Sequence, residues 1–349
     1  MTLLYTDVED ELRAAVRDLL ADRCPPAAVL ARVEGAPYDL GLWKTLARDI
    51  GVAGLLVPEE YGGAGASARE AAVVLEELGR ARDARPVLHQ LGSGHPRAAP
   101  GGGGRAAARR GGGRSHRSPS SCPCSASPYR EAGGQVSATD GRLTGVVGAV
   151  AGADVADVLL VPVKGTLHAV PAAEATVEVA PSLDLTRPIA TVTFAGSVAE
   201  PLGAVDVAET LRFGARAAGL RAARRGRVVP GDDARLREGA LPVRQACRSF
   251  QAIKHRLADL WLDVVRARAA ARGATDGAAM SAAVAQAWNA GVAVHVAEEA
   301  VQLHGGIGMT WEHPLHLFLK RAKSAEIALG TPGEHREALA ALADLPGPA

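Results

Sequence analysis

A glycine-rich string near the C-terminus has the composition of an anion-contacting loop. Residues 302–308 read Gln-Leu-His-Gly-Gly-Ile-Gly and follow a long apolar stretch with helical spacing. A helix that ends in two glycines lets the backbone approach a bulky polyanion and exposes N–H groups to it. The alternative is structural: Gly305 and Gly306 stop the helix, and His304 is a structural residue. Both interpretations place a helix end here.

Three histidines lie near this string and raise the question of a metal site. His304, His313 and His316 are accompanied by one carboxylate, Glu312, and lack acidic residues at ligand spacing. Among the cysteines, residues 122 and 124 form one close pair without the second pair that a zinc site needs. We therefore expect no metal.

The expected secondary structure that positions these residues changes from helices to strands and back to helices along the chain. Residues 1–80 have helical spacing, with Asp7 as the expected first cap and Ser67 with Glu70 as a capping box. Residues 135–200 contain short β-branched runs that predict a small antiparallel β module. Helical spacing then returns. The expected strands are residues 158–163, 167–170, 176–179 and 190–194, and the expected later helices are residues 206–220, 276–303, 314–329 and one that Thr331 begins with a capping box.

Composition and charge exclude several classes of protein. The chain has 349 residues, with 39 Lys and Arg against 38 Asp and Glu, so its net charge is +1. This balance gives no field that would attract nucleic acid or an anionic membrane. No apolar run approaches the ~20 residues that span a bilayer. The N-terminus lacks the features of a signal peptide. We expect a cytoplasmic protein without nucleic-acid or membrane partners.

Two arginine-rich stretches interrupt the order of elements. Residues 81–130 hold nine Arg, no Lys and one acid, and residues 221–248 hold eight Arg and two Pro where a long helix is expected. The first stretch has too few large aliphatic side chains to offset its ordering entropy, so we expect a disordered basic linker.

Four strings resemble motifs of the acyl-CoA dehydrogenase family and occur in the family's order. They lie outside the two arginine-rich stretches. Residues 57–65 resemble its P-E-x-Y-G-G-x-G turn, residues 249–259 its F-Q-x-x-x-x-x-L-A-D helix start, residues 302–308 its Q-x-H-G-G-x-G flavin signature, and residues 320–323 its R-D-A-K string.

The resemblance implies an α+β fold in three parts. These are an N-terminal helical domain (residues 1–130), a small antiparallel β domain (131–204) and a C-terminal four-helix bundle (205–349). It also implies FAD as the cofactor, an acyl-CoA substrate, and a homo- or hetero-oligomer such as a dimer of dimers. In the family, the glycine string meets a flavin held mainly by a neighbouring subunit. By that resemblance the cofactor-binding residues are Gln251, Gln302, Gly305, Gly306 and Thr331.

The family's reaction removes the α-proton of an acyl-CoA thioester with a carboxylate base while a hydride leaves for flavin. In most relatives that Glu precedes the Gly-Thr after the R-D-A-K helix, but Leu329 stands there. Some relatives carry the base on the first helix of the bundle, which makes Glu209 the catalytic candidate, although it is equally an ordinary solvated residue. Some actinobacterial relatives, including steroid side-chain dehydrogenases, are heteromers in which one subunit type lacks the base. Leu329 fits that description.

The arginine-rich stretches stand where two further family motifs are expected, a loop entering the β domain and a string whose Arg meets the FAD pyrophosphate. We interpret both as out-of-frame translation of a GC-rich gene. The alternative is a basic insert that binds an acidic partner or nucleic acid through residues 97–117. Two functions stay open: an acyl-CoA dehydrogenase, or a subunit of one, and an inactive subunit that completes a partner's FAD site. Short, branched and steroid-derived thioesters all stay open as substrates.

Overall fold

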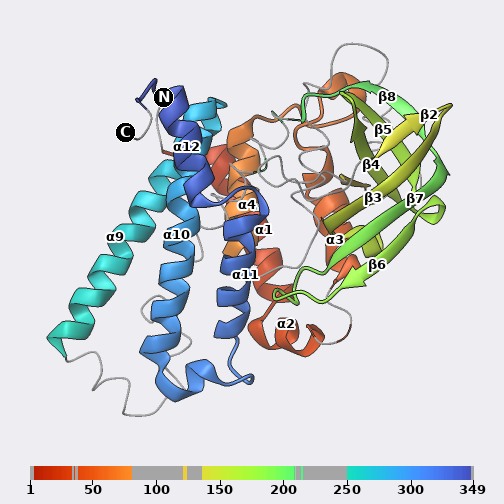
Figure 1. Ribbon diagram of the computed structural model, residues 1–349. Helices are drawn as coiled ribbons and strands as arrows, with labels where there is room; N and C mark the ends of the chain where they lie inside the picture. Colours follow the sequence, from red (N-terminus) through yellow and green to blue (C-terminus); the bar gives the residue numbers. More distant parts are fainter. Residues whose placement is uncertain are drawn as a thin grey trace.

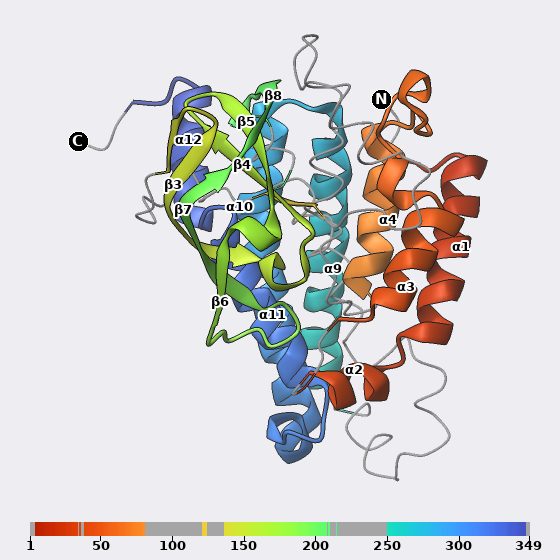
Figure 2. The same ribbon diagram turned by 90° about the vertical axis from the view of Figure 1, so that its right-hand side faces the viewer.

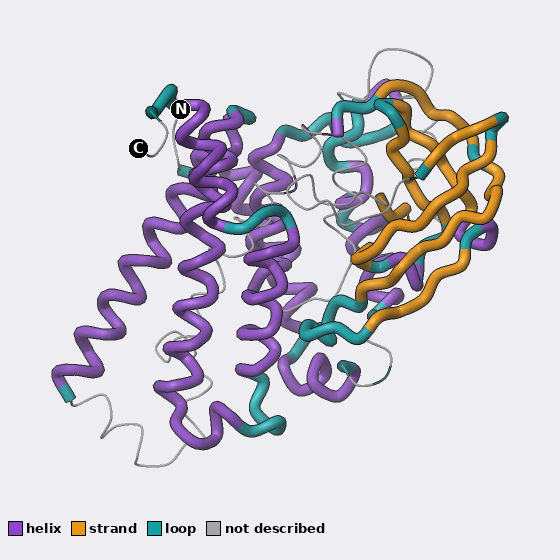
Figure 3. Tube along the Cα trace, viewed as in Figure 1, coloured by secondary structure: helices purple, strands orange, loops and turns teal. Residues whose placement is uncertain are grey.

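The computed structural model describes residues 4–33, 35, 38–80, 121–123, 136–207, 209, 214 and 250–346. Within these ranges, helices precede and follow a block of strands, which Figure 3 distinguishes by colour. The predicted α+β class is confirmed. Most of both arginine-rich stretches lies outside the described residues, so their interpretation as frameshifts stays a hypothesis. The predicted domain boundaries likewise stay predictions.

The N-terminal part is helical, and its caps explain where the helices begin. The first helix is capped by Thr6 and not, as predicted, by Asp7. The Glu9 N–H donates to the Thr6 hydroxyl at 3.3 Å, and the Thr6 N–H donates to the Glu9 carboxylate at 2.7 Å. Asp7 lies in the first turn, where an acid suits the helix dipole. The helices are α1 (Asp7–Arg23), α2 (Pro26–Arg32), α3 (Leu40–Lys44), which continues as a π-helical turn (Thr45–Asp49), and α4 (Ala68–Arg80); short 3-10 turns cover Val52–Gly54 and Glu59–Tyr61.

Two four-stranded sheets form the β domain, in the orders β1–β4–β5–β8 and β2–β3–β7–β6. All pairs are antiparallel except β1 with β4, which is parallel. β1 also falls within the stretch that we expected to be disordered, so that expectation is wrong for its three residues. Phe194, Leu143 and Leu159 are buried in this domain's core. The strands are β1 (Ser121–Pro123), β2 (Ser137–Thr139), β3 (Arg142–Ala151), β4 (Val158–Val163), β5 (Thr166–Pro171), β6 (Thr176–Ala180), β7 (Ile189–Val198) and β8 (Glu200–Ala204).

The C-terminal part contains four described helices. They are α9 (Gln251–Gly273), α10 (Ala279–His304), α11 (Leu315–Ala328) and α12 (Pro332–Leu342). In Figure 1 they lie mainly on the left and the strands on the right, and Figure 2 shows the N-terminal helices to one side of both. Figure 2 shows α1, α3 and α4 grouped beside α9. Among the described residues, no helix is long and apolar enough to cross a membrane.

An apolar core joins the N-terminal helices to the C-terminal ones. Leu42, Leu46 and Leu75 from the first part belong to the same buried cluster as Leu260 of α9 and Val296 of α10. These two parts therefore share one core, whereas the β domain has its own.

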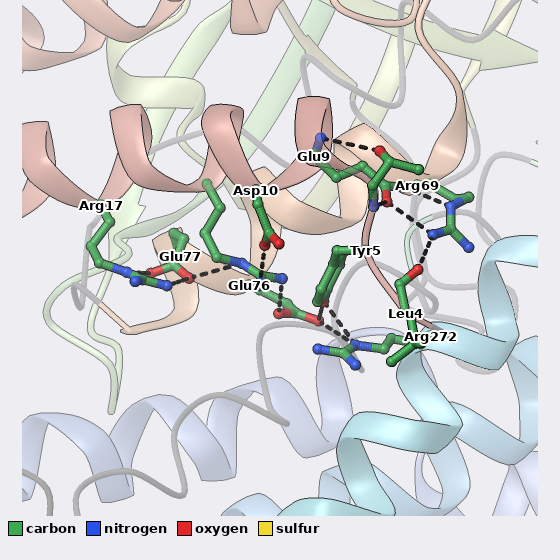
Figure 4. A network of polar contacts seen from close by, with 11 residues as sticks. Leu4, Tyr5, Glu9, Asp10, Arg17, Arg69, Glu76, Glu77 and Arg272 are labelled. Atoms are coloured by element: carbon green, nitrogen blue, oxygen red, sulfur yellow. Dashed lines mark hydrogen bonds and ion pairs between the residues drawn. The ribbon is translucent and has the colours of Figure 1, made fainter. Parts of the chain in front are cut away.

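A polar network strengthens this junction (Figure 4). The ring of Tyr5 lies between two guanidinium groups, 3.5 Å from Cζ of Arg13 on α1 and 4.0 Å from Cζ of Arg272 on α9. The Tyr5 hydroxyl donates to Oε1 of the buried Glu76 on α4 at 2.6 Å and accepts from Nε of Arg272 at 2.8 Å. Burial and the Glu76 carboxylate raise the pKa of Tyr5 to about 12. The network thus ties three helices together through one phenol.

Candidate functional site

The glycine loop (residues 302–309) ends α10, and its glycines have different reasons to be there. Gly305 has φ 62°, a conformation that side chains disfavour, so it stops the helix. At Gly308 an added Cβ would lie 2.6 Å from the Val301 carbonyl oxygen, so packing requires glycine. At Gly306 neither constraint applies, because an added Cβ would meet nothing within 4 Å. Folding therefore leaves Gly306 unexplained, whereas close approach by an outside group would explain it.

The segment after the loop is held by stacked rings. The Trp311 ring stacks on His316 at 4.4 Å between centroids, and Nζ of Lys320 lies 3.9 Å from the Trp311 centroid. The His304 and His313 rings lie 5.0 Å apart, and Nδ1 of His304 donates to the Ala300 carbonyl at 2.7 Å. Burial and, to a smaller extent, the charge of Lys320 lower the pKa of His316. Within the described ranges, no three His, Cys, Asp or Glu residues are grouped to hold a metal. These side chains shape the loop.

The residues predicted to bind the cofactor include Gln251, which lies at the same end of the bundle as the glycine loop. Nε of Arg256 on α9 donates to Glu299 on α10 at 2.9 Å. Because α9 and α10 form an antiparallel hairpin, this contact sets their register and puts Gln251 level with His304. Gln251, Gln302, Gly305 and Gly306 are all exposed.

A second predicted group lies in the α11–α12 turn (residues 329–335). Thr331 caps α12: its N–H and its hydroxyl donate to Oε2 of Glu334 at 2.6 and 2.8 Å, and the Glu334 N–H donates back to the hydroxyl at 3.3 Å. Nε2 of the buried His335 donates to the Leu329 carbonyl at 2.8 Å. Gly330 has φ 96° and lets the chain reverse between the helices.

The side chain of Leu329 packs against a third element. An added Cβ at Gly214 would lie 3.4 Å from Cδ1 of Leu329, so the two positions face each other. Gly214 and Glu209 are both helical, and the Glu209 N–H donates to the capping carboxylate of Asp206 at 2.9 Å. Along the helix expected over residues 206–220, Glu209 and Gly214 are roughly 140° apart around the axis. On that expected helix, Glu209 would not share the face that meets Leu329.

The two groups lie at opposite ends of the bundle. Nε2 of Gln286 donates to the Ala325 carbonyl at 3.5 Å, which places the last turn of α11 beside the first part of α10. At 1.5 Å rise per residue, α10 separates Gln286 from Gly305 by roughly 28 Å. In Figure 1, α12 accordingly lies near one end of α10 and the chain leaves the other end into the glycine loop. One chain thus does not close a single pocket from both groups.

Comparisons with known proteins agree with these features. The pattern described as "Acyl-CoA dehydrogenase, N-terminal domain" matches residues 6–95, and "Acyl-CoA dehydrogenase, C-terminal domain" matches residues 211–343. Acyl-CoA dehydrogenase IpdE2 of Mycolicibacterium smegmatis is 32% identical over 95% of this chain and 97% of its own length. The IpdE2 of Mycobacterium tuberculosis is 31% identical over 93% of both chains. This chain belongs to the acyl-CoA dehydrogenase family.

Solved structures share the fold. Butyryl-CoA dehydrogenase from Megasphaera elsdenii superposes with a TM-score of 0.78 at 21% identity, covering 98% of this chain and 100% of that one. The ChsE4-ChsE5 complex from Mycobacterium tuberculosis gives a TM-score of 0.75 at 23% identity, covering 99% and 100%. The family predicted from the four strings is confirmed, and so is its architecture of helical ends around a small β domain.

One family string departs from its pattern at a buried contact between the β domain and α11. Where the acyl-CoA dehydrogenase motif R-D-A-K has Asp, this chain has Arg321, which is 6% exposed and forms an ion pair with Asp184 in the β6–β7 connection. Asp184 also accepts from the Thr186 hydroxyl at 2.6 Å. Nη2 of Arg187 donates to the Ser324 hydroxyl at 2.8 Å. Burial and, to a smaller extent, the charge of Arg321 lower the pKa of Arg187 to about 10.

The family implies FAD, and the two groups fit it unequally. The glycine loop fits a large anionic group, because Gly306 leaves room beside its backbone and Gln302 is exposed. Thr331 fits less well, because its N–H and hydroxyl both donate to Glu334. It can meet a flavin as a hydrogen-bond acceptor, or as a donor after releasing Glu334.

Proposed function

We propose that this chain is a subunit of an FAD-dependent acyl-CoA dehydrogenase whose flavin pockets form between chains. Each pocket pairs the glycine loop of one chain with the α11–α12 turn of another. The separation of roughly 28 Å between these regions along α10 carries the proposal, because a pocket needs both and one chain cannot bring them together. The exposed apolar tip of the loop supports it: Ile307 is 55% and Met309 78% exposed.

In this assembly, this chain and its partner supply different parts of the reaction. Bound FAD would take a hydride from the β-carbon of the acyl-CoA, and the α-proton must go to a base. Leu329 cannot accept a proton, and Glu209 lies on another side of its expected helix. We therefore assign the base to a carboxylate of a partner chain of the same fold. This chain's loop then binds the anionic part of the cofactor in that pocket.

The partner and substrate follow from the relatives only as proposals. One fold neighbour is a complex of two differently named chains, ChsE4-ChsE5, which supports a heteromer here. Another is a variant of the Tcur3481-Tcur3483 steroid ACAD, with a TM-score of 0.78 at 22% identity and coverage of 97% of this chain and 98% of that one. Steroid-derived thioesters therefore belong in the substrate panel beside short and branched ones. The cytoplasmic location stays part of the proposal.

The runner-up is an inactive subunit that completes only its partner's FAD site. Two observations favour it: the apolar Leu329 at the position of the base, and the commitment of both Thr331 donors to Glu334. Under this alternative the turn contacts no flavin at all.

The test is to express the chain together with the flavoproteins of its gene neighbourhood and to measure FAD per chain and bleaching of the flavin band by acyl-CoAs. Gly306→Val should remove most of the flavin from the pocket that the loop completes. Gly291→Val on α10 is the matched control, because an added Cβ there also meets nothing within 4 Å.

The outcomes separate the alternatives. Bound FAD that acyl-CoA bleaches, and that Gly306→Val depletes while Gly291→Val does not, supports the proposal. A complex that stays colourless with every partner and substrate contradicts it. A flavin content that responds to Gly306→Val but not to Thr331→Val identifies the runner-up. Glu209→Gln should leave turnover within about twofold of the wild type, because a lost general base costs roughly 10²–10⁴-fold.

A further inference from the structure

His335 is a buried histidine that joins the end of α11 to the start of α12. Its side chain is 3% exposed, and Nε2 lies 2.8 Å from the Leu329 carbonyl oxygen. A carbonyl oxygen only accepts hydrogen bonds, so Nε2 must carry the proton. The bond closes a loop from residue 329 to residue 335 around Gly330, whose φ is 96°.

Other hydrogen bonds of the turn lie within the first turn of α12. Thr331 and Glu334 bond to each other within the first turn of α12, and the His335 N–H donates to the Thr331 carbonyl at 3.1 Å. These bonds hold the start of α12 but do not reach α11. The bond from His335 does reach back to α11, because it ties the backbone of Leu329 to α12.

We infer that His335 is the positioning residue of the α11–α12 turn, a neutral imidazole that fixes Leu329 and Thr331 as one wall of a flavin pocket. This inference rests on the proposed function, because it assigns the turn to that pocket. His335 touches neither cofactor nor substrate and acts through the backbone that it holds.

The charge state of His335 should couple this wall to pH. Burial lowers the pKa of His335, while the Leu329 carbonyl and the neighbouring carboxylate of Glu334 act in the opposite direction and are outweighed. The folded turn therefore favours the neutral ring. Its contribution is complete above the ordinary His value of about 6.5 and declines as the pH falls below it.

The experiment compares two substitutions that differ in one hydrogen-bond donor. His335→Gln keeps an N–H near Nε2, and His335→Leu has similar bulk without a donor. His295→Leu, at an exposed site on α10, is the control for loss of a histidine. Amide hydrogen exchange of Thr331, Glu334 and His335 is measured in the flavin-free chain, and the dissociation constant of FAD is measured in the complex from pH 5.5 to 8.

We expect His335→Leu to raise amide exchange in the turn about tenfold and His335→Gln to stay within about threefold of the wild type. FAD affinity should fall with His335→Leu. In the wild type it should weaken as the pH falls below 6.5, and in His335→Gln it should be flat with pH. Equal exchange in the two variants overturns the inference, as does unchanged FAD affinity in His335→Leu.

Failure of the proposed function would look different. If the wild-type complex binds no FAD, the proposed function fails, whereas exchange in the flavin-free chain still decides whether His335 holds the turn. If His335→Leu does not fold, exchange in the wild type between pH 5.5 and 8, corrected for the intrinsic rate, replaces it. Protection lost below pH 6.5 supports the inference, and protection independent of pH overturns it.

Discussion

The side chain of Leu329 fits into the space that Gly214 leaves beside its backbone. The closest approach of an added Cβ at Gly214 is 3.4 Å, an ordinary contact, so the helix and the turn already meet at this point. Glutamate follows the same path as leucine to Cδ and extends one bond further, to its carboxylate oxygens. A carboxylate at position 329 would therefore occupy a half-buried site between the same two elements, where a catalytic base is expected in most relatives.

Leu329→Glu should convert the pocket on this chain's turn from silent to active if that pocket holds flavin. A missing general base slows proton transfer by roughly 10²–10⁴-fold, so adding one would bring in a second working pocket and raise turnover per complex about twofold. Leu329→Gln, which has the shape without the charge, should add nothing. The measurement is kcat per complex. An equal gain from both variants would contradict a role for the carboxylate.

At the scale of elements, Asp184 joins the β domain to α11. One buried carboxylate lies near two guanidinium groups, those of Arg321 and Arg187, and also accepts from Thr186. Removing the carboxylate should therefore have a different effect on stability from removing one of its arginine partners. Loss of the acid leaves two cations together, whereas loss of Arg321 leaves Asp184 with Arg187 at 3.8 Å.

Asp184→Asn should destabilise the fold more than Arg321→Met. We expect the first to lower the free energy of unfolding by about 3–5 kcal/mol, because it leaves buried charge without a counter-ion. The second should cost about 2 kcal/mol, in the range of a hydrogen bond to a charged group. Urea unfolding of both variants, with Glu178→Gln on the exposed face of β6 as the control, checks the order. The reverse order would show that Arg187 does not pair with Asp184.

At the scale of the whole molecule, the phenol of Tyr5 links the N-terminal helices to α9. Its folded pKa is about 12, against about 10 in an unfolded chain. Between pH 10 and 12 the unfolded chain releases this proton while the folded chain keeps it. The free energy of unfolding therefore falls as the pH rises through that window, and the contribution is complete below pH 10.

Tyr5→Phe should remove this pH dependence. Below pH 10 the variant should be less stable by about 1–3 kcal/mol, because the buried Glu76 loses a donor. Above pH 10 the difference between wild type and variant should shrink. Urea unfolding at pH 8, 9.5 and 11 measures it, and the remaining tyrosines cancel in the difference. A difference that stays constant with pH would contradict the assignment of the raised pKa to Tyr5.

Local signals were sufficient to predict most elements. The Thr331 capping box begins α12 as predicted, and β4 covers residues 158–163 as predicted. β3 was missed because Gly145 and Gly148 dilute its β-branched pattern and two irregularities shift its register. Thr6 was passed over in favour of Asp7 because both are good caps, and only the reciprocal bond with Glu9 distinguishes them.

Contacts between residues that are distant in the sequence could not be predicted from local sequence patterns. Asp184 and Arg321 are far apart in sequence, and nothing local indicates that they meet. The role of Glu76 was not predicted either, because its partner Tyr5 lies far away in the sequence, just before α1. For His335, the capping box predicts where α12 begins, but only the structure shows that the residue after Glu334 contacts the end of α11. The predicted roles of Gln251, Gln302, Gly305, Gly306 and Thr331 stay predictions.

The distance between the glycine loop and the α11–α12 turn has a genetic consequence. In the proposed assembly, a lesion in the loop would spoil the pocket that this chain completes for a neighbour, and a lesion in the turn would spoil a different pocket. Two alleles that are each defective at opposite ends would therefore restore one flavin-binding pocket in a mixed assembly wherever copies of this chain face one another, and bound FAD is the readout because Leu329 leaves that pocket without a base. Two alleles defective at the same end would not. Complementation between alleles thus reports which chains share a pocket without any structure of the assembly.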